Sequence, residues 1–449
     1  MTAFLGVDIG TYESKGILVD ASGRVLATAA RPHRMLVPQP GWAEHRPVED
    51  WWDDLAAITR QLLAESGLPS SAIGCVAVSA IGPCMLPVDA QGEPLCNAVL
   101  YGVDTRAAAE VAELSDQIGE AALLRTGGNT LTSQAVGPKI LWLRRNRPEI
   151  YARTALVLSS TPFLVQRLTG AVVMDHYSAG SFSPLYDVSG RCWNTALAGS
   201  IISTDALPRL VETTEIVGTV TRAAAEATGL AAGTPVIAGT IDAAAEAFSV
   251  GVHAPGDLML MYGSTVFTIM LTAAPLIDSR VWYAPWIVGG LHASAASLTT
   301  CGTLTHWFRD QLARDLSAPD AMARLTAEAA ATPPGANGLV ALPYFSGERN
   351  NPLAKGCFFG LDLTHERGHL FRAVLEGIAC GVRQLLETYA QTGCTPRRAV
   401  AVGGGTRNAV WLQAVADSCR IEQALPTHTL GAAFGDAMLA AVAVGAASL

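Results

Sequence analysis

Apolar and polar residues alternate in short blocks at the start of the chain. Residues 4–7 are apolar, residues 8–14 are rich in turn-forming and polar types, and residues 16–19 are apolar again. This pattern predicts a strand, a loop and a second strand that ends in a turn. A Walker loop or a dinucleotide-binding loop needs a helix directly after its glycines, whereas this chain returns as a hairpin. Both of those nucleotide folds are therefore disfavoured.

The same pattern recurs in the second half of the chain. Residues 258–261 and 266–271 are predicted strands, and the polar residues 262–265 lie between them. Both hairpin loops offer hydroxyls and backbone N–H groups, so we expect them to bind phosphates from the two sides of a cleft. We divide the chain into residues 1–245 and residues 246–449.

Helical periodicity is clearest at residues 370–386, where apolar residues recur every three or four positions. Strand-like runs at residues 75–78, 236–238 and 399–402 alternate with helical stretches. Alternation of this kind is typical of a layered α/β fold.

Composition narrows the class of protein. The 449 residues are enough for at least two domains, and a chain that is 50% hydrophobic and 15% charged is expected to be globular. The formal net charge of -9, without a Lys/Arg cluster, argues against nucleic acid as a partner. Because the chain has no secretory-type start and no run of about 20 apolar residues, we expect a cytoplasmic protein without a membrane partner.

The first loop carries candidate chemistry. Asp8 ends a predicted strand, Gly10 allows close approach of a ligand, and Thr11, Ser14 and Lys15 can hydrogen-bond phosphate oxygens. Asp8 can also hold a magnesium ion through water. An ordinary β-hairpin is the alternative for this segment. The second hairpin favours the functional interpretation.

Several segments of this chain resemble the FGGY carbohydrate kinases. They are Gly6-Val7-Asp8-Ile9-Gly10-Thr11, the loop at Gly263, and residues 402–405. The most specific is Gly356-Cys357-Phe358-Phe359-Gly360-Leu361, followed after seven residues by His369-Leu370 and then by Ala373-Val374-Leu375-Glu376, which is similar to that family's C-terminal signature. The N-terminal signature is kept in part, at residues 139–143.

The resemblance covers essentially the whole chain. It implies an α/β protein of duplicated actin-like, ribonuclease-H-like domains with a central cleft. It also implies that residues 1–245 bind a sugar and residues 246–449 bind ATP, with magnesium arriving with the nucleotide. The nine histidines show no metal-ligand spacing, so we expect no transition metal held by the protein alone.

The family's catalytic base falls on Asp242, where a predicted strand ends and a helix begins. Phosphoryl transfer needs a carboxylate within reach of the attacking hydroxyl, and a helix N-terminus keeps it ionised. The local sequence alone also allows a helix cap at this position. The family pattern around Asp242 favours catalysis.

The resemblance also implies a set of ATP contacts from both halves of the chain, mostly through backbone groups, with Lys15 neutralising phosphate charge. Near the phosphates these are Thr11, Ser14, Lys15, Gly263, Ser264, Thr265 and Gly302, and near the adenosine they are Gly404, Gly405 and Asn408.

Residues 100–106 resemble the family's W-x-D-x-R segment, in which the acid and the base hydrogen-bond hydroxyls of the sugar. Here they are Asp104 and Arg106, and Tyr101-Gly102 replaces the tryptophan. Gln134 falls about where glycerol kinases have a contacting tyrosine, so it is either a sugar ligand or a surface amide.

The substrate is less clearly indicated than the reaction. Residues 79–84, which include the candidate contact Gly82, lack the Met-His dipeptide of similar xylulokinases. Residues 343–349 are similar to the xylulokinase and gluconokinase branches, which favours ketoses and sugar acids.

The sequence thus predicts a xylulokinase-like enzyme that phosphorylates a small sugar or polyol with ATP, a ketopentose such as xylulose being the first candidate. A kinase for another sugar, polyol or sugar acid, such as erythritol or gluconate, remains open, as does an actin-like ATPase without a sugar acceptor. We also allow for a homodimer.

Overall fold

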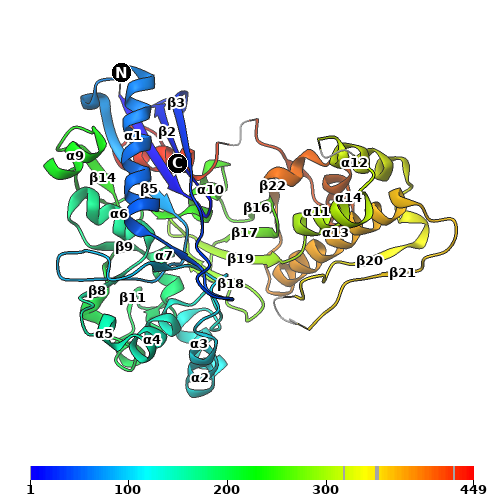
Figure 1. The fold of residues 1–449 in the computed structure, drawn as a ribbon, viewed down its shortest axis with the longest axis horizontal. Helices are drawn as coiled ribbons and strands as arrows, with labels where there is room; N and C mark the ends of the chain where they lie inside the picture. Colours follow the sequence, from blue (N-terminus) through cyan, green and yellow to red (C-terminus); the bar gives the residue numbers. More distant parts are fainter. Residues whose placement is uncertain (1, 317–318, 349–352, 428–429, 449) are drawn as a thin grey trace.

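The computed structural model of the chain describes residues 2–316, 319–348, 353–427 and 430–448. Two lobes are visible in Figure 1, and each is built on its own mixed β-sheet. Arg349, which belongs to the segment that favours ketoses and sugar acids, lies outside the described residues.

The N-terminal lobe is built on a seven-stranded sheet of order β13-β14-β5-β1-β2-β3, in which β15 also pairs with β5. The bounds are β1 (Ala3–Ile9), β2 (Glu13–Asp20), β3 (Val25–Pro32), β5 (Ile73–Ala80), β13 (Ile216–Thr219), β14 (Pro235–Ile237) and β15 (Thr240–Ile241).

The C-terminal lobe is built on a six-stranded sheet of order β18-β19-β17-β16-β22-β23. The bounds are β16 (Asp257–Tyr262), β17 (Val266–Thr272), β18 (Trp282–Pro285), β19 (His292–Leu298), β22 (Arg398–Val402) and β23 (Gln423–Ala424).

Both predicted hairpins are present, and the strands of the first are longer than expected. Asp8 pairs with Lys15 and Ile9 with Ser14, so the turn contains residues 10–12 alone. The second hairpin joins β16 to β17 through residues 263–265. The first strand of each hairpin also pairs in parallel with a later strand, β1 with β5 and β16 with β22. This repeated arrangement confirms the internal duplication.

The two faces of β1 are covered by different helices, because successive side chains of a strand point to opposite faces. Leu5 and Val7 pack in one hydrophobic cluster with Leu55 of α1 (Asp53–Ser66). Phe4 packs in another with Ala437 of α15 (Ala432–Ala443). Asp8 has the parity of Phe4 and therefore lies on the α15 side.

Helix α15 and α10 (Asp242–Ser249) lie between the two sheets. The cluster that contains Phe4 and Ala437 also contains Ala244 of α10 and Met259 and Val400 of the second sheet. No side chain fits at Gly6, because a Cβ there would lie 1.9 Å from the Ala433 carbonyl oxygen. The last helix therefore packs on the first strand of the chain.

The remaining elements complete the two lobes. The helices are α2 (Ala108–Ile118), α3 (Glu120–Gly127), α4 (Val136–Asn146), α5 (Pro148–Tyr151), α6 (Ser160–Thr169), α7 (His176–Ala179), α8 (Thr195–Ala198), α9 (Arg222–Thr228), α11 (Gly302–Leu312), α12 (Ala321–Ala331), α13 (Arg367–Gln391) and α14 (Ala409–Cys419). The short strand pairs are β4 (Glu44–His45) with β7 (Ala98–Val99), β6 (Leu86–Val88) with β8 (Leu156–Leu158), β9 (Val173–Asp175) with β12 (Arg209–Val211), β10 (Tyr186–Asp187) with β11 (Cys192–Trp193), and β20 (Val340–Leu342) with β21 (Cys357–Phe359).

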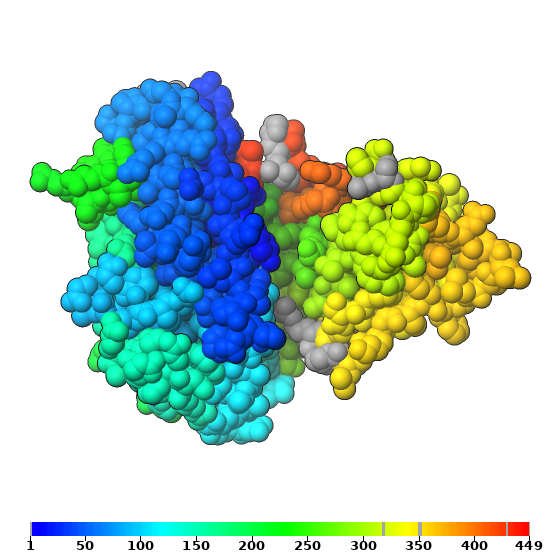
Figure 2. Space-filling view, in the orientation of Figure 1, coloured from blue at the N-terminus to red at the C-terminus, as the bar shows by residue number. Residues whose placement is uncertain are grey.

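Helix α13 contains the predicted apolar stripe at residues 370–386, and its buried residues include Val374, Ile378 and Val382. Figure 2 shows a hollow between the blue surface of the N-terminal lobe and the yellow-green surface of the C-terminal lobe. Among the described helices, none has the length and apolar character needed to cross a membrane.

Candidate active site

Asp8 and Lys15 lie side by side on the face of the first hairpin that is turned toward α15. Asp8 is 9% exposed, whereas Lys15 is half-exposed and forms an ion pair with Glu13 at 3.1 Å. The turn that follows Asp8 is closed by a hydrogen bond from the Gly10 N–H to the Glu13 carbonyl at 3.0 Å. Thr11 Oγ1 lies 3.3 Å from the Tyr101 hydroxyl. The turn therefore touches the segment predicted to bind the sugar.

Ser14 is placed differently from the prediction. Its hydroxyl is fully buried and donates to Asp54 of α1 at 2.8 Å. The reason is strand alternation, because Ser14 and Lys15 are neighbours on β2 and must point to opposite faces. The structure assigns the Ser14 hydroxyl to the support of the hairpin and leaves Asp8 and Lys15 on the other face.

A buried group of carboxyls surrounds Asp8. The Ser79 hydroxyl lies 2.6 Å from Asp436 Oδ2 and 3.3 Å from Asp8 Oδ1. Burial, and then the charges of Asp242 and Glu246, raise the pKa of Asp8 well above its ordinary range. Burial likewise raises the pKa of Asp436, whose Oδ1 makes no hydrogen bond within the described chain. Such a group binds protons, or a cation, in preference to remaining fully charged.

Asp242 belongs to the same edge of the sheet. Strand β15 pairs in parallel with β5, so that Thr240 lies beside Ser79, and Ser79 lies beside Asp8 on β1. Asp242 follows β15 directly as the first residue of α10. Ligands of α/β proteins bind at this carboxyl edge of parallel strands.

The local contacts of Asp242 do not make it a helix cap. Ile241 occupies the cap position, and Asp242 Oδ1 accepts only from the N–H of its neighbour Ala243, at 2.7 Å. Burial, with a further contribution from Glu246, raises the pKa of Asp242 to about 7. A carboxyl whose pKa lies near neutrality is suited to accept a proton from a hydroxyl.

Asp104 and Arg106 bind each other in this structure. Arg106 Nη2 lies 2.8 Å from Asp104 Oδ2 and 2.9 Å from Glu44 Oε1, and its guanidinium stacks 3.9 Å from the centre of the Trp42 ring. Asp104 Oδ2 also accepts from the Ala43 N–H at 2.7 Å. Asp104 and Arg106 are two positions apart in the chain, which allows the Arg106 guanidinium to fold back onto the Asp104 carboxylate. Asp104 and Arg106 therefore form a buried ion pair, and their bidentate contacts with sugar hydroxyls stay a prediction.

The other two predicted sugar contacts, Gln134 and Gly82, pack against residues that are near Asp104 and Asp242 in the chain, respectively. Gln134 Oε1 accepts from the Gly102 N–H at 3.0 Å, and a Cβ on Gly102 would lie 2.7 Å from the Gln134 amide. A Cβ on Gly82 would lie 2.8 Å from Ile241. Gly82 thus allows residues 81–83 to pack against the residue that precedes Asp242.

The second hairpin turn is held by the start of α11. The N–H groups of Gly302 and Cys301 donate to the carbonyls of Gly263 and Ser264, at 3.1 Å in both cases. A Cβ on Gly302 would lie 2.4 Å from the Gly263 carbonyl oxygen. Gly302 is therefore required for the close approach of the helix to the turn. The Ser264 side chain is exposed and that of Thr265 is half-buried.

The residues predicted to lie near the adenosine stand between β22 and α14. Gly404 and Gly405 lie in a 3₁₀ turn after β22, where a Cβ on Gly404 would meet nothing within 4 Å and one on Gly405 would lie 2.6 Å from Trp411. Asn408 caps α14, because its Oδ1 accepts from the Trp411 N–H at 3.1 Å. The Asn408 side chain is 8% exposed, and its Nδ2 makes no hydrogen bond within the described chain, so its contact with the adenosine stays a prediction.

Three polar residues of the site were not predicted from the sequence. Glu246 follows Asp242 by four residues on one helix face, which is a signal that the sequence does contain. Asp436 is the one carboxylate in the apolar helix α15, and a lone charge there was a second available signal. Ser79 carries no local signal, because its partners are 71 and 357 residues away in the chain.

The carboxyl groups suit magnesium held through water. The charges of Asp242 and Glu246 raise the pKa of Asp8, and the charge of Glu246 raises that of Asp242. Oxygen ligands are those that magnesium prefers. Within the described ranges, no three His, Cys, Asp or Glu side chains are close enough to ligate an ion directly. Asp8 therefore suits a hydrated magnesium ion that is bound together with a nucleotide.

The chain is similar to known proteins over nearly its whole length. The xylulose kinase of Escherichia coli is 31% identical over 98% of this chain and 90% of its own length. The autoinducer-2 kinase of Salmonella typhimurium is 30% identical over 98% of this chain and 86% of its own length.

Among solved structures, that of xylulose kinase from Rhodospirillum rubrum superposes with a TM-score of 0.94 at 35% identity, covering 99% of this chain and 90% of that one. The fold is therefore the two-domain actin-like α/β fold that the sequence predicted. Residues 3–249 match the N-terminal domain of the FGGY family of carbohydrate kinases and residues 258–444 match its C-terminal domain. With both family domains present in order, the chain belongs to the FGGY family of carbohydrate kinases, enzymes that phosphorylate sugars with ATP.

Proposed function

We propose that this kinase phosphorylates an uncharged ketopentose, xylulose being the first candidate, and that Asp242 is its catalytic base. The observation that carries the proposal is the position of Asp242 at the carboxyl edge of β15, next to the strands that carry Ser79 and Asp8. A hydroxyl bound beside Asp242 would face phosphates held by the two hairpin turns. This geometry suits an in-line transfer from ATP.

The electrostatics of Asp242 suit the proton transfer. Since burial brings the pKa of Asp242 to about 7, a substantial share of the enzyme holds an ionised carboxylate at neutral pH. That carboxylate accepts the proton of the sugar hydroxyl as its oxygen bonds to the γ-phosphorus and the bond to ADP breaks. Placing the base at the start of α10 favours the ionised form.

The two turns share the task of holding the phosphates. In this proposal Thr11 and Lys15 act from the N-terminal lobe, and Gly263, Ser264 and Thr265 act from the C-terminal lobe. Magnesium carried by ATP would be held by Asp8 through water, where it neutralises phosphate charge. Lys15 must exchange its surface ion pair with Glu13 for a phosphate, which costs little because exposed pairs contribute about 0–1 kcal/mol.

The charges around the sugar segment favour an uncharged acceptor. Arg106 is paired with both Asp104 and Glu44. The buried Lys139 donates to the carbonyls of Leu100 and Tyr101. Arg106 is thus paired with two carboxylates and Lys139 is held by backbone carbonyls, so neither of these two cations is left to pair with the carboxylate of a sugar acid. This supports a neutral sugar over gluconate, in keeping with relatives named xylulose kinases.

The lobes divide the work in this proposal. Residues 1–245 bind the sugar and residues 246–449 bind the nucleotide. The proposed division lies within α10, which separates the two sheets. Closure of the lobes would exclude water from the bound phosphates.

A substrate screen tests the proposal. The purified protein is assayed with MgATP and each of xylulose, ribulose, gluconate, erythritol and glycerol, with coupled detection of ADP. We expect xylulose to give the largest kcat/KM and gluconate to give little turnover. ADP release that is equally fast with and without every sugar would contradict the proposed function, and a preference for gluconate would contradict the charge argument.

A further inference from the structure

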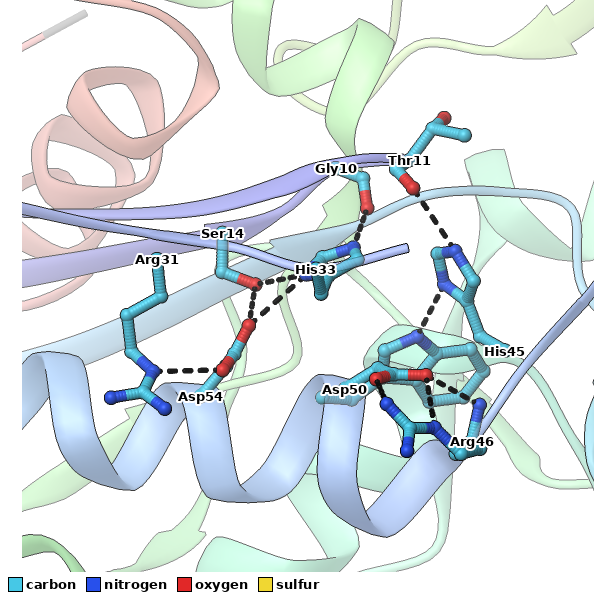
Figure 3. A network of polar contacts seen from close by, with 10 residues as sticks. Gly10, Thr11, Ser14, Arg31, His33, His45, Arg46, Asp50 and Asp54 are labelled. Atoms are coloured by element: carbon cyan, nitrogen blue, oxygen red, sulfur yellow. Dashed lines mark hydrogen bonds and ion pairs between the residues drawn. The ribbon is translucent and has the colours of Figure 1, made fainter. Parts of the chain in front are cut away.

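Three successive carbonyl groups of the first hairpin turn are held by two buried histidines. His33 Nε2 lies 3.0 Å from the Gly10 carbonyl oxygen, and His45 Nε2 lies 3.1 Å from that of Thr11. The His33 backbone N–H donates to the Tyr12 carbonyl at 2.9 Å. Both rings lie on the same side of the turn, as Figure 3 shows.

The proton positions on His45 follow from its partners. Its Nδ1 accepts from the indole N–H of Trp51 at 3.0 Å, and an indole nitrogen can only donate. His45 Nε2 must therefore carry the hydrogen that is donated to Thr11. Burial lowers the pKa of His45 to about 4, so the ring stays neutral and its tautomer is fixed.

His33 donates from both of its ring nitrogens. Its Nε2 faces the Gly10 carbonyl and its Nδ1 lies 3.0 Å from Asp54 Oδ2, and both partners accept. Burial opposes the charge of His33, but the bond to Asp54 outweighs it and raises the pKa above the usual 6.5. This charge is complete below the usual pKa and is lost as the pH rises through the raised value.

The charged surroundings of His33 come from four elements. Asp54 of α1 is also bound by Arg31 of β3 at 2.9 Å. Asp50, in the π-helical turn Pro47–Trp52, adds a second negative charge and is paired with Arg46 at 2.6 Å. The ring of His45, on β4, lies 5.0 Å from that of His33 and is neutral. His33 is thus fixed by a chain of ion pairs that ends at the surface.

Holding the carbonyls determines where the neighbouring N–H groups point. In a trans peptide, the C=O and the following N–H point in opposite directions. The N–H groups of Thr11 and Tyr12 are therefore turned away from the histidines. Neither makes a hydrogen bond with any residue that the structure describes. Consecutive unpartnered N–H groups form a concave site for an anion.

We propose that His33 and His45 are positioning residues for the first hairpin turn. Their rings hold the carbonyls of Gly10 and Thr11 on one side of the turn. The N–H groups of Thr11 and Tyr12 then point from the other side toward the terminal phosphates of ATP. The inference rests on the proposed nucleotide site. It adds a role for two histidines that touch neither the nucleotide nor the sugar.

Calorimetric titration with the magnesium complex of AMP-PNP tests this role in the full-length protein without any sugar. The variants are His33→Leu and His45→Leu, with His253→Leu as the matched control, because the His253 side chain is exposed and makes no hydrogen bond in the described chain. We expect the dissociation constant for AMP-PNP to rise about tenfold in each of the first two variants, which is the loss expected for one buried hydrogen bond. The control should bind like the parent.

Two further measurements separate positioning from general damage. AMP lacks the terminal phosphates, so its affinity should be the same in all folded variants. His33→Gln keeps an amide N–H that can reach the Gly10 carbonyl and should recover part of the lost affinity.

The outcomes distinguish the inference from the proposed function. A parent protein that does not bind AMP-PNP would contradict the nucleotide site and the inference together. Parent-like AMP-PNP binding by either leucine variant, with a cooperative melting transition, would overturn the inference alone. An equal loss of affinity for AMP and AMP-PNP would overturn it as well. If one leucine variant does not fold, the other decides, because the two rings hold adjacent carbonyls.

Discussion

The two hairpin turns have the same place in their lobes and are supported in different ways. In the N-terminal turn the carbonyls are held by imidazole rings, and an ion pair with Asp54 supports one of them. In the C-terminal turn the carbonyls of Gly263 and Ser264 are held by backbone N–H groups at the start of α11. In the proposed function, the opposite side of each turn faces the phosphates of ATP.

The difference shows that a duplicated fold can keep a geometry while the groups that maintain it change. Backbone support requires a glycine at residue 302 and does not depend on pH. Side-chain support needs no glycine in the supporting strands, but it places titratable groups beside the turn that we propose to bind the nucleotide. The N-terminal side is therefore the side at which the enzyme should respond to protons.

The largest effect is expected from removing the base, which leaves both turns intact. Asp242→Asn should lower kcat about a thousandfold, since general-base catalysis contributes about 10²–10⁴. Steady-state rates with the best sugar of the screen measure this loss, and calorimetry with AMP-PNP should give parent-like affinity. A kcat within tenfold of the parent value would show that Asp242 is not the base.

The pH dependence of kcat tests whether the protonation of Asp242, which lies in the N-terminal lobe, limits the rate. Because the pKa of Asp242 is raised to about 7, its carboxyl is protonated below that pH and cannot accept a proton. We expect kcat to fall about tenfold for each pH unit below that value, as for a single essential base. Rates at saturating substrate from pH 5.5 to 9 measure this limb, and a flat profile would argue against it.

Gly302→Ala perturbs the backbone support of the C-terminal turn. The new methyl group would lie 2.4 Å from the Gly263 carbonyl oxygen, so the turn must shift. We expect the KM for MgATP to rise about tenfold, by displacement of groups that position the phosphates. The control is Gly199→Ala, where the added Cβ meets nothing nearer than 3.4 Å. The acid limb of kcat should persist in Gly302→Ala, and its loss would mean that the two supports are not independent.

Asp436→Asn should produce the smallest effect, on stability. Burial raises the pKa of Asp436 in the folded state, so the folded protein binds a proton that the unfolded chain releases above about pH 4. Stability is therefore lost as the pH rises from that value through the raised pKa, and a neutral amide avoids the loss. Thermal denaturation without ligand should give a melting temperature about 1 °C higher than the parent at pH 8, a gain of about 1 kcal/mol, and little change at pH 5. A lower melting temperature at pH 8 would contradict the sign.

Local patterns predicted most of the fold. The two hairpins, the strand at residues 399–402 and the long helix around Val374 all have clear periodicity. The proposal of Asp242 as the base came from the family pattern, since the local sequence alone also allowed a helix cap. Its position beside Ser79 and Asp8 depends on three strands that lie far apart in the chain.

The predictions that differ from the structure concern the direction in which side chains point. Ser14 was grouped with Lys15 because both follow the same turn, but a strand separates neighbours onto opposite faces. The pairing of Asp104 with Arg106 was not foreseen, and it depends on Trp42 and Glu44 from another segment. Strand alternation is a local rule that separates Ser14 from Lys15 once the strand is known to reach the turn. The contacts of Arg106 with Trp42 and Glu44 span many residues of sequence, and no local pattern contains them.

The packing of α15 on β1 has a consequence for how the protein is made. Strand β1 is translated well before α15, the helix that covers the face with Phe4 and Gly6. Domains usually fold as units while the ribosome is still working. Here one apolar face of the N-terminal sheet stays uncovered until α15 has been translated. Truncation before residue 432 would therefore damage the lobe at the other end of the sequence.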